Sequence, residues 1–186
     1  MGKAYPGGAS LIRHSLAAFL SLVLLAGSAP AEEVAKAASD RAVALSAATL
    51  KEFAAGKATA VYARFDEVMR GTVTKADFAA FMQQNAAQSG AITKPRTHAV
   101  TLYRQRELLV AVDWSGRTTG GGAACGFFLW SGADTPDPKI RRFEVTYLPA
   151  GLAKAQDPRK TAVLMAQLHC GPALIKDLTG VTVNLN

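Results

Sequence analysis

Apolar positions between residues 32 and 90 recur with the spacing of amphipathic helices. The alanine-rich stretch 32–56 predicts a first helix, which Gly56 is suited to end. A second apolar stripe predicts one continuous helix that Gly71 ends, with Val68 facing inward. This stripe consists of Val61, Phe65, Val68 and Met69.

A third helix is predicted where Thr74 is followed three residues later by Asp77. In this pattern, similar to a capping box, the threonine hydroxyl accepts a hydrogen bond from a backbone N–H of the first turn. Phe78, Phe81 and Met82 continue the apolar stripe, and a glycine at position 90 closes the helix.

The stretch FDEVMRGTVTKADFAAFM, residues 65–82, also has the outline of a calcium-binding hand. Asp66 would stand at loop position 1 and Gly71 at position 6. Positions 3 and 5, however, are Val68 and Arg70, whose side chains offer no oxygen to a calcium ion. We therefore expect two helices that meet at a glycine stop and a threonine cap, with no metal site.

After Pro95 the pattern changes to that of strands. The segments THAVTLYR, LLVAVDWSG, CGFFLWSG and KIRRFEVTYL predict strands, separated by a glycine-rich loop and a turn around DTPDP. Residues 151–186 contain a predicted helix around 159–169 and a final strand-like VTVNL. Helices followed by strands predict an α+β fold, with N-terminal helices packed on a curved, mainly antiparallel, cone-like sheet and a C-terminal extension.

The first 31 residues have the features of a secretory signal peptide. Their start is basic, the apolar run SLAAFLSLVLLAG is too short to span a bilayer comfortably, and Ala29-Pro30-Ala31 fits the small-x-small exit. An uncleaved membrane anchor is the competing interpretation. We expect a periplasmic or secreted protein with a domain over 32–150, a docked extension over 151–186 and no membrane-spanning segment in the mature chain.

Charge and cysteine content narrow the class of protein. Removal of Lys3 and Arg13 with the leader leaves 19 basic and 14 acidic residues, a net charge of +5. No block of five like charges is present, so we expect no nucleic-acid partner. Cys125 and Cys170 both lie in the exported part and predict a disulfide, with two free thiols or half of a metal site as alternatives.

Residues from about 41 to 150 resemble the nuclear transport factor 2-like superfamily, in its small secreted bacterial forms of unknown function. The resemblance is one of spacing through the helices and into a meander of strands. It is carried by Gly56, Tyr62, Phe65, Met69, Thr74, Phe78 and Gly90. It implies a curved sheet wrapped around a long helix, forming a cone that is open or filled. Enzymes of the superfamily place an Asp, His or Tyr inside the cone.

Three residues are candidates for catalysis. Asp113, in VAVDWSG, is the best acid, because an apolar strand could raise its pKa and make it a base. His98 shares a predicted strand face with Val100 and Leu102 and could face the cone, and Tyr103 could donate to a ligand carbonyl. Each has a structural alternative: capping of the turn for Asp113, and ordinary strand packing for the other two.

These observations favour a binding or accessory module over an enzyme. The expected partner is a protein, an envelope component or a small apolar molecule, with a homodimer also possible for an open sheet, and no cofactor is expected. The alternative is an isomerase- or hydratase-like enzyme that uses Asp113 with His98 or Tyr103. A cone lined by these side chains would favour the enzyme, and a cone filled by Phe and Trp would favour the interaction protein.

The exported protein is expected to begin at Glu32, because Ala31 ends the small-residue exit. The intact mass of the protein recovered from the periplasm or the medium measures this directly. A mass that retains residues 1–31 would contradict the assignment.

Overall fold

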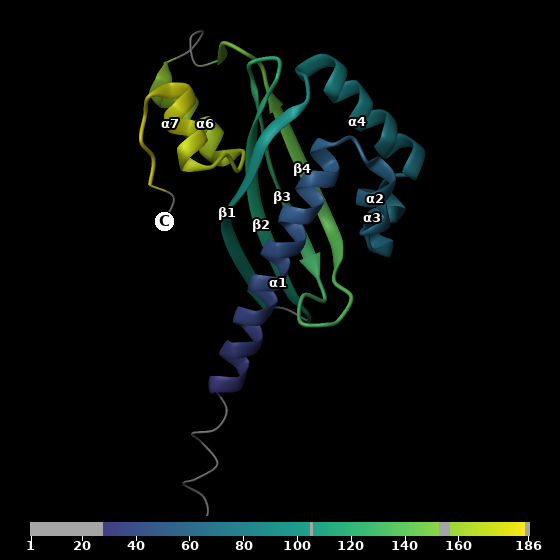
Figure 1. Ribbon diagram of the computed structural model, residues 1–186. Helices are drawn as coiled ribbons and strands as arrows, with labels where there is room; N and C mark the ends of the chain where they lie inside the picture. The colour runs from purple at the N-terminus through teal and green to yellow at the C-terminus, as the bar shows by residue number, and fades with distance from the viewer. Residues whose placement is uncertain (1–27, 105, 153–156, 185–186) are drawn as a thin grey trace, which may run out of the picture. The chain divides into compact units, whose positions relative to one another are not determined.

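Figure 1 shows the computed structural model of the chain, which describes residues 28–104, 106–152 and 157–184. The predicted signal peptide lies outside the described residues except for 28–31, so cleavage after Ala31 stays a prediction.

The described residues from 35 onwards form one compact unit. No helix in the described ranges combines the length and apolar character that crossing a membrane requires. The helices that precede the sheet are α1 (Ser28–Ala54), α2 (Ala58–Ala63), α3 (Glu67–Thr72) and α4 (Lys75–Ser89).

Four strands follow the helices and form a single antiparallel sheet in the order β1-β2-β3-β4 (Figure 1). They are β1 (Ile92–Arg104), β2 (Leu108–Thr118), β3 (Ala123–Ser131) and β4 (Lys139–Leu148). Two further helices complete the described chain, α6 (Pro158–Gln167) and α7 (Pro172–Thr179). The predicted α+β class is confirmed, with helices preceding the antiparallel strands and a helical C-terminal part.

The inner face of the sheet, defined by Trp114, Phe128 and Trp130, carries the main hydrophobic core. These rings pack with Phe53 of α1 and Phe78 of α4, and most of the core side chains are almost fully buried. The Nε1–H of Trp130 donates a 2.7 Å hydrogen bond to Ser46 Oγ, which satisfies the buried indole. Aromatic side chains therefore fill the space between the helices and the sheet.

The outer face, defined by Asp113, Cys125 and Phe127, carries a second and smaller core at one end. Alternation along β3 produces both faces, because successive side chains of a strand point to opposite sides. Here α6 and α7 contribute Ala162, Met165 and Ile175, which pack on the sheet around Cys125. The predicted pairing of Cys125 with Cys170 is present, with an Sγ–Sγ distance of 2.02 Å.

The continuous helix predicted before Gly71 is wrong. The chain breaks into α2 and α3, and Val68, predicted to face inward, is 56% exposed. The break occurs because the backbone N–H of Asp66 donates to Ile140 O at 3.0 Å, and the N–H of Ile140 donates to Arg64 O at 2.8 Å. These two long-range bonds replace helical ones.

The C-terminal part also differs from the prediction. The segment VTVNL was expected to be a strand, but its described residues, 181–184, have no regular secondary structure. A second helix, α7, precedes it, beginning with Pro172 at its first turn and followed by Gly180 in the left-handed conformation. The predicted third helix is confirmed as α4, with the Thr74 hydroxyl accepting from the N–H of Asp77 at 3.1 Å.

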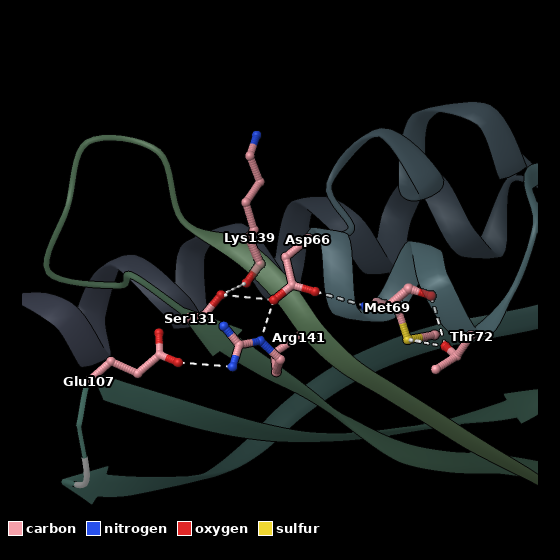
Figure 2. A network of polar contacts seen from close by, with 7 residues as sticks. All are labelled: Asp66, Met69, Thr72, Glu107, Ser131, Lys139 and Arg141. Carbon is pink, nitrogen blue, oxygen red and sulfur yellow. Dashed lines mark hydrogen bonds and ion pairs between the residues drawn. The ribbon is translucent and has the colours of Figure 1, made fainter.

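Figure 2 shows the polar contacts of Asp66, the residue at position 1 of the possible calcium loop. One carboxylate oxygen caps α3 by accepting from the N–H of Met69 at 2.9 Å. The other oxygen is bound by the Arg141 guanidinium, which also contacts Glu107 Oε1 at 2.9 Å. Arg141 is the extra residue of a β-bulge, since Ile140 and Arg142 pair with consecutive residues of β3.

Replacing Asp66 with Ala is expected to lower the free energy of unfolding by about 2 kcal/mol, because it removes a helix cap and a half-buried charge-assisted contact. Urea denaturation measures the change. Glu67→Ala is the matched control, because this exposed neighbouring carboxylate should change stability by less than about 0.5 kcal/mol. Millimolar calcium should leave the melting temperature unchanged, and a calcium-dependent rise that Asp66→Ala removes would contradict the cap assignment.

Candidate functional site

The part of the outer face that α6 and α7 leave uncovered is hollowed into a cavity of about 460 Å³, which we call the outer groove. All four strands line it, together with one residue of the α6–α7 turn. The lining residues are Thr101, Tyr103, Leu109, Ala111, Asp113, Phe127, Leu129, Arg142, Glu144 and His169.

Strand register places the polar side chains of the groove around one aromatic ring. Asp113 of β2 is opposite Phe127 of β3, and Phe127 is opposite Glu144 of β4. The adjacent row on the same face consists of Ala111, Leu129 and Arg142. The two apolar side chains of the second row, Ala111 and Leu129, thus form a floor beside the charged side chains of both rows.

His169 enters the groove from an unusual backbone position. Helix α6 ends at Gln167 with Leu168 as its C-cap, and His169 follows with a φ of +61°. This left-handed position after a helix is the one that glycine usually occupies. The imidazole Nδ1 lies 3.0 Å from Asp113 Oδ2, and the ring centroid lies 4.8 Å from that of Phe127.

Arg142 approaches the same phenylalanine. Its guanidinium carbon lies 5.6 Å from the centroid of the Phe127 ring, within the range of a cation–π contact. The guanidinium also forms an ion pair with Glu144. Phe127 therefore contacts both bases of the groove, and each base is paired with its own acid.

The structure brings two of the three predicted catalytic residues, Asp113 and Tyr103, into the groove. They lie on the face of the sheet opposite the aromatic core, so the filled interior contains neither. His98 lies elsewhere: its Nε2–H donates to the carbonyl oxygen of His169 at 3.1 Å, beneath the α6–α7 turn. A register irregularity between Thr97 and Ala99 turns it away from the face predicted for it.

Sequence reasoning missed His169 as a groove residue. A signal was available, because Cys170 follows it directly and Cys125 was its predicted partner. Cys125 is opposite Ser115, and Ser115 is two residues from Asp113 on the same face of β2. The predicted disulfide therefore implied that residue 169 lies close to Asp113.

Close packing under the turn holds His98 in place. A Cβ added to Gly171 would lie 2.7 Å from the His98 ring, so only glycine allows this approach. The N–H of Gly171 donates to Ser115 Oγ at 3.2 Å. Burial lowers the pKa of His98 below its ordinary 6.5, and the nearby Asp113 carboxylate opposes that shift only in part.

A smaller cavity of about 160 Å³ lies on the inner side, where α1, α4 and the start of β1 meet. Its lining is mostly apolar, with Phe53, Met82 and Ile92 among the contributors, and Tyr147 supplies one phenol. Burial raises the pKa of Tyr147 to about 12. In the described ranges, no cluster of three or more His, Cys, Asp or Glu side chains is placed to hold a metal ion.

Comparisons of the chain with protein-family models, with curated proteins and with solved structures found no match.

The lowered pKa of His98 should be visible in the pH dependence of the free energy of unfolding. Since its pKa is lower in the folded protein, the unfolded chain binds the proton more tightly, and the free energy of unfolding should fall as the pH drops below about 6.5 towards the folded pKa. His98→Gln keeps an N–H for the His169 carbonyl and should reduce this fall.

Urea denaturation between about pH 8 and about pH 5 measures the effect. Asp113 and His169 are the ionisable groups whose charges act on His98, so His169→Gln serves as the control for the second imidazole. Parallel pH profiles for the native protein and His98→Gln would contradict the assignment.

Proposed function

We propose that the chain is an exported binding module and that the outer groove is its binding surface. The observation that carries the proposal is the conformation of His169. A left-handed backbone costs a non-glycine residue about 1 kcal/mol or more, and such strain gathers at functional sites. At this position a glycine would serve the turn, whereas histidine places an imidazole over an open sheet face.

The filled interior supports a binding role over catalysis inside the fold. Phe53, Trp114 and Phe128 occupy the space where an enzyme of the resembled superfamily would hold its acid or base. The inner cavity of about 160 Å³ is close to the size that accommodates a benzene-sized molecule, so it suits only a very small apolar ligand. The outer groove, at about 460 Å³, is within the usual range of ligand sites.

Export and superfamily are parts of the same proposal. The leader-like start and the Cys125–Cys170 bond support a periplasmic or secreted location. The order of helices followed by an antiparallel meander supports a relationship to the nuclear transport factor 2-like superfamily. A homodimer would use surfaces outside the groove, such as the exposed Val100 and Leu102 of the edge strand β1.

A proton-transfer enzyme is the second candidate, and the contact between Asp113 and His169 favours it. A carboxylate that holds Nδ1–H orients an imidazole so that Nε2 can act as a base, and Tyr103 lines the same groove. The activity would be of the isomerase or hydratase kind. Exchange of α-protons of small ketones in D2O, followed by NMR, should then exceed the buffer rate and vanish in His169→Gln.

Binding at the groove can be tested by two-dimensional ¹H–¹⁵N NMR with a library of small polar and aromatic fragments. Fragments that bind should shift the amide signals of Phe127, Leu129 and the His169 turn. His169→Gly should keep the fold, because glycine suits the left-handed position, and should lose these shifts.

Lys94→Gly is the matched control, because Lys94 is the other non-glycine residue with a positive φ among the described residues. It relieves the same kind of strain without touching the groove, so fragment binding should be unchanged. Fragments that shift only residues of the inner cavity, or shifts that survive His169→Gly, would refute the groove as the binding surface.

A further inference from the structure

We propose that the outer groove binds a neutral saccharide, an inference that rests on the binding role proposed above. The class of ligand follows from three properties of the groove: its charged groups already have polar partners, these groups keep spare hydrogen-bonding capacity, and one aromatic side chain is exposed beside an apolar floor.

The four charged or ionisable side chains of the groove form two acid–base pairs. Asp113 contacts His169, and Glu144 is paired with Arg142. A charged ligand would have to compete with the contact that each of these groups already makes. A neutral ligand that hydrogen-bonds to both pairs leaves these contacts in place, so the arrangement favours a ligand without net charge.

Each pair leaves donors and acceptors unused. A carboxylate offers about four acceptor positions and a guanidinium five N–H donors, and one ion pair occupies only part of them. With Nδ1 directed to Asp113, the His169 ring keeps Nε2, and 42% of its side chain is exposed. Hydroxyl groups, which both donate and accept, match such a mixed array better than a purely basic or acidic ligand does.

Several contacts restrain the array before any ligand arrives. Phe127 contacts both the imidazole and the guanidinium, at 4.8 Å between ring centroids and 5.6 Å from centroid to guanidinium carbon. The disulfide fixes the turn that carries His169. Polar groups already held in place lose little conformational entropy on binding, which matters most for ligands that gain only weak hydrogen bonds.

Tyr103 supplies the aromatic surface that the C–H face of a sugar ring needs. It is 45% exposed, in contrast to Phe127, whose ring is engaged by both bases. Ala111 and Leu129 form an apolar floor on the same face of the sheet. A ring that stacks on Tyr103 over this floor can direct its hydroxyls towards Asp113 and Arg142.

The test is a set of NMR titrations of the native, disulfide-bonded protein with defined probes. Neutral disaccharides (maltose, cellobiose and N,N′-diacetylchitobiose) are compared with a zwitterion, glycylglycine, and with phosphate and tetramethylammonium as charged probes. At least one disaccharide should give saturable shifts at the Phe127 and His169 amides. Its affinity should be unchanged between about 50 mM and about 500 mM NaCl, because no net charge is neutralised.

Two variants with matched controls assign the contacts. Tyr103→Ala should weaken disaccharide binding about fivefold through loss of stacking, whereas Leu102→Ala, at the exposed neighbouring residue of the opposite face, should not. Asp113→Asn should weaken it about tenfold or more, whereas Asp134→Asn in the exposed β3–β4 hairpin should not.

The saccharide class is overturned if no disaccharide shifts the groove, or if binding occurs only with charged or zwitterionic probes and is lost in salt. In the second case the groove remains a binding surface and only the ligand class is wrong. If neither these probes nor the fragment library shifts the groove, the proposed binding function fails as well.

Discussion

The bond between Cys125 and Cys170 is the constraint on which the outer face depends. It joins β3 to a tail whose apolar side chains pack on the sheet and on one another, around Ala123, Met165 and Ile175. Docking such a tail orders many residues for a small buried area, and a covalent link across 45 residues lowers the entropy cost of that ordering. The same link determines where the α6–α7 turn lies.

The strained turn is tolerated because several contacts define it at once. The carbonyl oxygen of His169 accepts a hydrogen bond from His98, and the imidazole of His169 contacts Asp113. The next residue, Cys170, is joined to β3 by the disulfide. A backbone in a sparsely populated region persists only where its surroundings determine it in this way. Docking of the tail therefore places His169 in the groove. There His169 and Arg142, the two bases of the groove, both contact Phe127.

Much of the fold could be predicted from local patterns. The first helix, the Thr74 cap, the antiparallel strands and the cysteine pairing all depend on signals within a few residues or on cysteine count. The break at Asp66 could not be predicted, because it depends on backbone bonds to Ile140, far along the chain. Tertiary contacts there override a helical pattern that is locally sound.

The candidate site was predictable only in part, for a related reason. Asp113 and Tyr103 stood out as polar or amphipathic residues in apolar strands, and both lie in the groove. His169 is 56 residues from Asp113, and its role comes from the turn geometry and the disulfide, neither of which a local pattern encodes. His98 was placed on the wrong side because an irregularity of β1 reverses the alternation that the sequence suggests.

Because residue 169 lies in a left-handed turn, the groove can change at this position while the fold stays the same. A glycine there satisfies the backbone, leaves the disulfide and the helix end intact, and removes the only imidazole among the groove-lining residues that the structure describes. Under the proposed binding role, a related chain could exchange the binding surface for a purely structural one by changing this single residue. The identity of that residue would then tell the two kinds of protein apart.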